Sequence, residues 1–110
     1  METFIQVPPA LCYALALNVQ LHMASTRRTQ ERVVAGRTSG QLELGETITW
    51  EARHLGLRQR LTVQITSAEP PAHFRDEMRR GAFKRLRHDH YFEPRQQGSA
   101  TLMRDVFAFE

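Results

Sequence analysis

Two histidines and two aspartates recur at alternating positions among apolar residues in the second half of the chain. One residue separates His88 from His90, and Asp76 and Asp105 lie in the segments on either side of them. Residues two apart in a strand share a face, so both imidazoles would point the same way, about 7 Å apart. Such a group suits a hydrogen-bonded polar wall, a zinc site with a third ligand, or a histidine that a carboxylate orients for acid–base catalysis. We favour the polar wall and expect neither a metal nor another cofactor.

The expected turns decide which of these side chains meet across neighbouring strands. A turn centred near Gln96 places His88 roughly opposite Asp105, and a turn at residues 81–82 brings Asp76 near residue 86 or His88. We therefore expect Asp76, His88 and Asp105 to form a cluster, with His90 on the same face.

Apolar residues share that face, where a packed core would exclude charged groups. A buried charge without partners costs several kcal/mol, so the face is predicted to be the wall of a partly wet cavity. Trp50 by itself is more typical of a core residue than of a ligand platform, although the two roles overlap in a cavity protein. The predicted ligand-binding residues are Trp50, Leu61, Val63, Phe74, Asp76, Met78, His88, His90, Phe92, Met103, Asp105 and Phe107.

Alternating hydrophobicity and turn residues predict the elements that carry these side chains. The predicted strands are residues 3–7, 26–34, 46–54, 57–67, 73–80, 83–92 and 99–109, and the predicted helices are 10–17 and 19–24. Consecutive strands with short links form an antiparallel meander, so the fold class is α+β in a single domain over residues 1–110. The first helix is apolar nearly all round, which predicts that it is well buried, and Asn18 is a candidate cap for the second.

Composition excludes several classes of protein. The formal net charge is +3, and the fourteen arginines are spread over many elements with acidic residues between them, so we expect no nucleic-acid binding. The single cysteine, Cys12, lies in an apolar run and excludes an internal disulfide. No apolar run approaches the roughly 20 residues that span a bilayer, and the N-terminus lacks the basic region of a secretory signal. We therefore expect no stable membrane insertion and a cytoplasmic location.

Several short motifs together resemble the SRPBCC superfamily, whose members are also called START-like or helix-grip proteins. The matching segments are Leu44–Leu57, Glu69–Phe74, Asp76–Glu77, Gly81–Phe83, Arg87–Pro94 and Met103–Asp105. The resemblance extends over essentially the whole chain and is to a bacterial branch described as polyketide cyclase/dehydrase-like.

The resemblance implies a strongly curved antiparallel sheet that wraps around a long C-terminal helix and encloses a cavity for hydrophobic small molecules. The chain stops at Glu110, where the family continues into that helix. We therefore expect a truncated helix-grip domain with two short N-terminal helices and no C-terminal helix. Its uncovered face would exceed the apolar patch that soluble monomers tolerate, which predicts a homodimer across this face or poor solubility.

The leading functional hypothesis is non-catalytic binding of a hydrophobic small molecule or lipid in the concave face of the sheet. Apolar side chains would form the walls, and Asp76, His88, His90 and Asp105 would orient a polar end of the ligand. The alternative is an enzyme of the aromatase/cyclase or dehydratase type, which would use His88 with Asp76 or Asp105. A third hypothesis is an interaction module whose uncovered face takes a helix from a partner chain.

Overall fold

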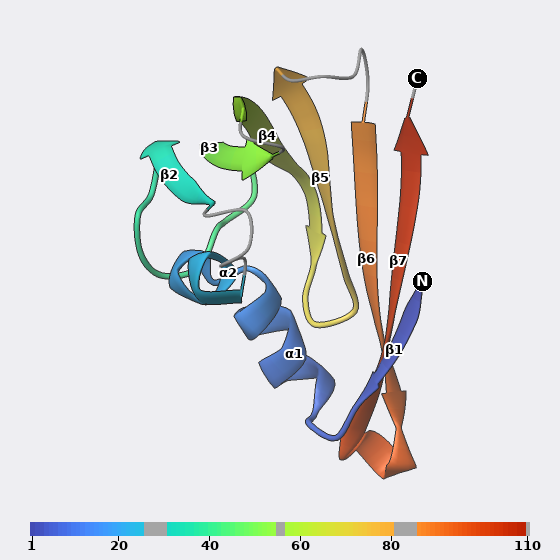
Figure 1. Ribbon diagram of the computed structural model, residues 1–110. Helices are drawn as coiled ribbons and strands as arrows, with labels where there is room; N and C mark the ends of the chain where they lie inside the picture. Colours follow the sequence, from blue (N-terminus) through green and yellow to red (C-terminus); the bar gives the residue numbers. More distant parts are fainter. Residues whose placement is uncertain (26–30, 55–56, 81–85, 110) are drawn as a thin grey trace.

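The computed structural model describes residues 1–25, 31–54, 57–80 and 86–109. Over these residues, seven strands form one antiparallel sheet in the order β1-β7-β6-β5-β4-β3-β2, and two helices pack on one side of it (Figure 1). Strands β2 to β7 follow one another along the sheet and β1 returns to pair with β7, so the predicted α+β meander is confirmed. The elements in chain order are β1 (Glu2–Ile5), α1 (Pro9–Ala16), α2 (Val19–Ser25), β2 (Arg32–Ala35), β3 (Thr47–His54), β4 (Leu57–Glu69), β5 (His73–Arg80), β6 (Leu86–Arg95) and β7 (Ala100–Phe109).

The sheet curves into a half-barrel, and aromatic side chains join its concave side to the helices. Tyr13 of α1 meets Phe74 and Phe92 edge-on, with ring centroids 5.6 and 5.5 Å apart. Farther along the sheet, His22 of α2 packs against Trp50 of β3 at 4.3 Å. Burial of these rings removes large apolar areas from water and so fixes the helices to the sheet. We call the helix side of the sheet the inner face and the opposite side the outer face.

Local sequence explains where the two helices begin. Pro8 precedes α1 and Pro9 occupies its first turn, where the missing N–H of proline leaves no helical hydrogen bond unmade. The side chain of Asn18 accepts a hydrogen bond from the backbone N–H of Leu21 at 2.9 Å, which is the predicted cap of α2. The helical segment therefore divides into two short helices, as the sequence indicates.

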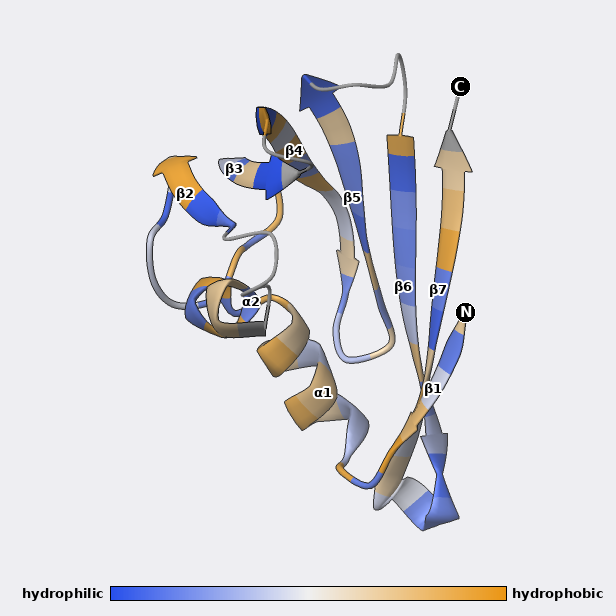
Figure 2. Cartoon of the chain, viewed as in Figure 1, coloured by the Kyte–Doolittle hydropathy of each residue, from blue (hydrophilic) through white to orange (hydrophobic). Residues whose placement is uncertain are grey.

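The first helix is less buried than its composition predicts. Cys12 and Tyr13 are buried against the sheet, but Leu11 and Leu15 are exposed. Figure 2 colours α1 as largely hydrophobic. The sheet covers one side of this helix, so apolar side chains on its other side lie at the surface. The prediction of a well-buried helix was therefore wrong.

Strand β6 is longer than predicted at its C-terminal end. It continues to Arg95, so Glu93 and Pro94 belong to a strand rather than to the predicted loop. Strand β5 begins at His73, opposite Tyr91, so beyond this point β6 pairs with β7 on one side and is an edge on the other. Proline is tolerated at such an edge because no partner needs its missing N–H.

Other boundaries also differ from the sequence-based ones. The strand predicted over residues 26–34 is β2, which occupies residues 32–35, while residues 26–30 lie outside the described residues. The turn predicted at 81–82 and the link between the predicted strands 46–54 and 57–67 lie outside them as well. Within the described ranges, no helix has the length and apolar character needed to cross a membrane.

Candidate functional site

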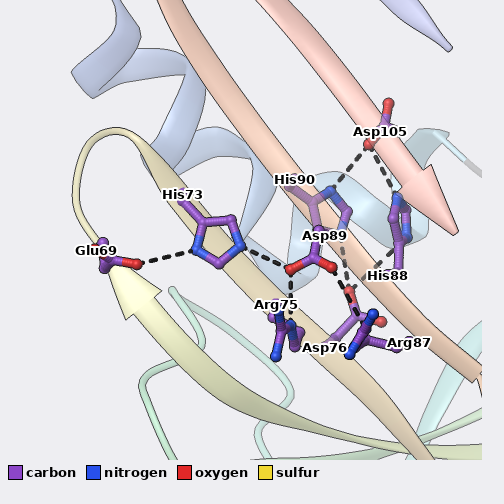
Figure 3. Close-up of polar contacts among 9 residues, drawn as sticks. All are labelled: Glu69, His73, Arg75, Asp76, Arg87, His88, Asp89, His90 and Asp105. Carbon is purple, nitrogen blue, oxygen red and sulfur yellow. Dashed lines mark hydrogen bonds and ion pairs between the residues drawn. The ribbon is translucent and has the colours of Figure 1, made fainter. Parts of the chain in front are cut away.

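Four predicted polar residues meet on the inner face of β5, β6 and β7. Asp76 of β5 lies opposite His88 of β6, as predicted, and His90 of β6 lies opposite Asp105 of β7. The predicted register, with His88 opposite Asp105, was wrong by two residues, although the two side chains are in contact. A shift of two residues keeps every side chain on its face, so the four side chains still meet (Figure 3). We call these four residues the inner cluster.

The loop between β6 and β7 accounts for the shifted pairing. Gln96 and Gln97 have positive φ angles of 50° and 56°, and Gly98 follows with a φ of 90°. These residues form a tight left-handed turn, and the strands pair from Arg95 and Ala100 outward. A left-handed backbone is uncommon at residues other than glycine, so residue preferences alone favour a different turn centre.

Each histidine of the inner cluster lies between the same two carboxylates. His90 Nε2 is 2.8 Å from Asp76 Oδ2, and His90 Nδ1 is 3.2 Å from Asp105 Oδ1. His88 Nε2 is 3.0 Å from the same Asp105 oxygen, and His88 Nδ1 is 4.0 Å from Asp76 Oδ2. The four side chains keep 16–22% of their area exposed, so a small solute can reach the cluster.

Aromatic rings cover the inner cluster on two sides. Phe74 stacks on His90 with ring centroids 4.1 Å apart, and Phe107 stacks on His88 at 3.9 Å. The two imidazole rings are themselves 3.7 Å apart. Phe74 is buried whereas Phe107 is 54% exposed, so the stack of rings runs from the core to the surface.

Burial lowers the pKa of His88 below its usual value of 6.5, and the neighbouring His90 ring acts in the same direction. Asp76 and Asp105 oppose this lowering of the pKa without reversing it. His88 is therefore a neutral imidazole at pH 7, which can accept a proton or bind a metal ion through one ring nitrogen.

An apolar groove of about 340 Å³ lies between the helices and the part of the sheet formed by β1 and β7. Its volume falls within the range of small-molecule sites, about 300–1,000 Å³. The groove is lined by Ile5, Val7, Cys12, Leu15, Ala16, Leu21, His22 and Met103. Met103 is the one residue among these that the sequence predicted as ligand-binding.

The other lining residues were missed because they come from the N-terminal elements. Cys12, Leu15 and Ala16 follow the i, i+3, i+4 spacing of one helix face. That signal is present in the sequence, but the nearly continuous hydrophobicity of α1 hides which side of the helix borders a groove.

The remaining predicted apolar residues lie elsewhere. Phe107 contacts the inner cluster from its exposed position. The others belong to the packed interior or its margin: Trp50, Phe74, Met78 and Phe92 are buried, and Leu61 and Val63 are half-buried.

The groove and the inner cluster are neighbours along β7. Met103 lines the groove, and Asp105 follows two residues later on the same face, about 7 Å farther along the strand. A ligand that extended from the groove along β7 past Met103 would reach the inner cluster.

A larger hollow, of about 550 Å³, is less suited to an apolar ligand. It is lined by Ser67, Glu69, Ala72, His73, Arg75, Tyr91, Phe92, Glu93 and Pro94. Charged groups in this lining already pair with each other or with neighbours, since His73 and Arg75 contact Asp89 at 2.8 and 2.7 Å. The apolar groove is therefore the better candidate for a hydrophobic ligand.

Comparison with known proteins identifies the fold. No family model and no curated protein matches the sequence. The crystal structure of Ara h 8.0201 matches with 15% identity and a TM-score of 0.71, over 100% of this chain and 76% of its own. A protein from Arthrobacter aurescens matches with 14% identity and a TM-score of 0.78, over 99% of this chain and 66% of its own.

A third similar structure is the major latex-like protein 151 of Panax ginseng. It matches with 14% identity and a TM-score of 0.72, over 100% of this chain and 76% of its own. Together these similarities show that the chain has the helix-grip fold with its curved antiparallel sheet. The chain spans about two thirds to three quarters of the length of these structures.

Proposed function

We propose that the protein binds a hydrophobic small molecule or lipid in the apolar groove and does not catalyse a reaction. The observation that carries this proposal is the groove itself, in which apolar side chains from both helices, β1 and β7 border about 340 Å³. The similar structures share the curved sheet, but at 14–15% identity they support the fold alone.

The lining of the groove makes burial of apolar ligand atoms favourable. Each buried methylene group contributes about 0.8 kcal/mol, so eight methylenes contribute about 6 kcal/mol. Part of this gain is offset by the lost freedom of the ligand on binding. The groove therefore favours a ligand with an extended apolar part over a small polar metabolite.

The inner cluster gives the groove a polar end. Asp105 follows Met103 on the same face, and His88 and His90 both contact Asp105. Ligand sites are typically apolar with a few polar groups that fix orientation. We therefore expect an amphipathic ligand whose hydroxyl, carbonyl or amine group lies at the inner cluster.

Acid–base catalysis, as in the polyketide cyclase/dehydrase-like branch, is the second candidate. The observation that favours it is the pair of carboxylate-bound imidazoles, His88 with Asp105 and His90 with Asp76. A carboxylate that holds a histidine in one orientation prepares it for proton transfer. His88→Gln separates the candidates, because it abolishes turnover in an enzyme but weakens binding about two- to tenfold where one hydrogen bond is lost.

Titration with the uncharged fluorescent probe N-phenyl-1-naphthylamine tests the groove. Leu15→Lys brings a charge to its lining, so we expect at least about a tenfold loss of probe affinity. Leu11→Lys is the matched control, because Leu11 lies in the same helix with similar exposure and does not line the groove. An equal loss in both variants, or in neither, would contradict binding in the groove.

Native mass spectrometry of the purified protein is the complementary measurement. A retained apolar compound gives a defined mass increase, which Leu15→Lys should reduce and Leu11→Lys should leave unchanged. The mass of the intact protein in the same spectrum tests the homodimer that we propose across the part of the inner face that the two helices leave uncovered.

A further inference from the structure

We propose that the inner cluster binds a divalent transition-metal ion, with Asp76, His88 and His90 as ligands and Asp105 as the carboxylate that orients both imidazoles. This site revises our expectation that the protein has no metal. It does not depend on an apolar ligand in the groove.

The three ligand residues already converge. Each offers one ligand atom, and these atoms all lie within 4.8 Å of one another. A tetrahedral ion with bonds of about 2.0–2.1 Å needs ligand atoms about 3.4 Å apart. Asp76 Oδ2 lies 2.8 Å from His90 Nε2 and 4.0 Å from His88 Nδ1, so the two distances bracket this value. The two imidazole rings, whose centroids are 3.7 Å apart, must turn away from each other for both nitrogens to face one ion.

Asp105 occupies the position expected of a carboxylate behind metal-bound histidines. Its Oδ1 lies 3.0 Å from His88 Nε2 and 3.2 Å from His90 Nδ1, which are the ring nitrogens directed away from Asp76. If both nitrogens donate to Asp105, both tautomers are fixed and the lone pairs of His88 Nδ1 and His90 Nε2 face Asp76. Metal-binding histidines usually donate their second N–H to a carboxylate or carbonyl in this way.

The arrangement offers a place for a cation beside Asp76. A neutral imidazole carries a single N–H, yet both nitrogens of His90 lie within hydrogen-bond distance of a carboxylate oxygen. When Nδ1 donates to Asp105, the lone pair of Nε2 faces an Asp76 oxygen at 2.8 Å, which is repulsive unless a proton or a metal ion lies between them. Within the described part of the chain, no lysine or arginine forms an ion pair with either aspartate. A divalent ion removes the repulsion and balances both carboxylates.

The ligand types narrow the class of ion. Two imidazole nitrogens and one carboxylate oxygen suit Zn²⁺, Fe²⁺ or Co²⁺, whereas Ca²⁺ and Mg²⁺ prefer sites built from oxygen. Three protein ligands leave a coordination position for water or for an oxygen of a bound molecule.

Isothermal titration calorimetry of the metal-free full chain with ZnCl₂ tests the proposal. We expect one ion per chain, and at least about a hundredfold loss of affinity in Asp76→Asn and His90→Gln. Asp105→Asn removes the orienting carboxylate and leaves the three ligands, so we expect about a 10- to 100-fold loss. His73→Gln is the matched control, because His73 also contacts an aspartate on β6 but lies on the outer face; its affinity should equal that of the original chain.

Circular dichroism shows whether each variant is folded, and the visible spectrum of added Co²⁺ reports nitrogen and oxygen coordination independently of the heat signal. No uptake of Zn²⁺ by the original chain would overturn the proposal and leave the cluster as a network that shares a proton. Unchanged affinity in folded Asp105→Asn and His90→Gln, or an equal loss in His73→Gln, would overturn it too. Because ZnCl₂ is the sole probe, these outcomes are independent of the groove experiment.

Discussion

Strands β5 and β6 carry a histidine–aspartate group on each face, and the two groups differ in their positive partners (Figure 3). On the outer face, buried Asp89 accepts hydrogen bonds from His73 Nε2 at 2.8 Å and Arg75 Nε at 2.7 Å, with Arg87 Nε at 3.6 Å. On the inner face, two carboxylates share two imidazoles and, among the described residues, no arginine or lysine. The outer carboxylate is thus paired with arginines, as in a structural ion pair, whereas the partners of the inner carboxylates among the described residues are histidines.

The pKa shifts follow the same division. Burial by itself raises the pKa of Asp89, but hydrogen bonds from His73 and Arg75 outweigh it, and the pKa falls below its usual value of 3.8. The hydrogen bond to Asp89 likewise raises the pKa of Arg75. On the inner face, burial dominates and lowers the pKa of His88. Outer-face charges thus stabilise one another, while the inner face holds a neutral base.

The largest expected difference between the faces is in stability. Asp89→Asn weakens two charge-assisted hydrogen bonds in a buried position, so we expect the free energy of unfolding to fall by about 2–3 kcal/mol. Asp105→Asn removes one of two neighbouring negative charges and keeps an amide oxygen as acceptor, so the expected cost is below about 1 kcal/mol. Urea unfolding of both metal-free variants at pH 7 measures the difference. An equal loss of unfolding free energy in the two variants would refute the distinction between a structural outer group and a functional inner group.

The pH dependence of stability should separate the two faces further. A pKa that is lower in the folded state contributes stability above the unfolded pKa, and this stability is lost as the pH falls. The contribution of His88 therefore decreases as the pH drops below 6.5, and that of Asp89 decreases below 3.8. Urea unfolding of the metal-free protein between pH 8 and pH 3 should show both losses.

Each loss should disappear in one variant. His88→Gln should flatten the dependence just below pH 6.5 and leave the more acidic part unchanged, whereas Asp89→Asn should do the reverse. A slope near pH 6 that persists in His88→Gln would assign it to another group and weaken the description of His88 as a buried neutral base.

The membership of the inner cluster could be predicted from sequence, but its pairing could not. Period-two alternation places Asp76, His88, His90 and Asp105 on one face whatever the register, because a shift of two residues preserves the face. The pairing across β6 and β7 depends on the left-handed turn beginning at Gln96, which residue preferences disfavour.

The groove and the outer group could not be predicted from the sequence, for a different reason. Both depend on contacts between distant elements: Cys12 and Met103 meet across the groove, and His73 meets Asp89 only once the register of β5 and β6 is set. Alternation predicted the meander because it is a local property of each strand. Which side chains of different elements come into contact depends instead on the curvature of the whole sheet, which is not a local property.

The smallest expected effect concerns the exposed end of the ring stack. Phe107 is 54% exposed, so Phe107→Ala should change the free energy of unfolding by less than about 1 kcal/mol. It nevertheless uncovers the His88 ring, and because burial is the main cause of the lowered pKa, the pKa of His88 should rise toward 6.5. Val106→Ala is the control, since Val106 is similarly exposed and lies opposite Asp89 on the outer face.

An NMR titration of the His88 ring protons in both metal-free variants measures this shift. A rise of the His88 pKa in Phe107→Ala with no change in Val106→Ala would show that the inner group is shielded from solvent by a single surface ring. An unchanged pKa in both variants would instead assign the shielding to Phe74 and the core. The pKa of His88 would then be lowered by the same packing that stabilises the sheet. In that case, the two faces would differ only in how their carboxylates are paired with positive charges.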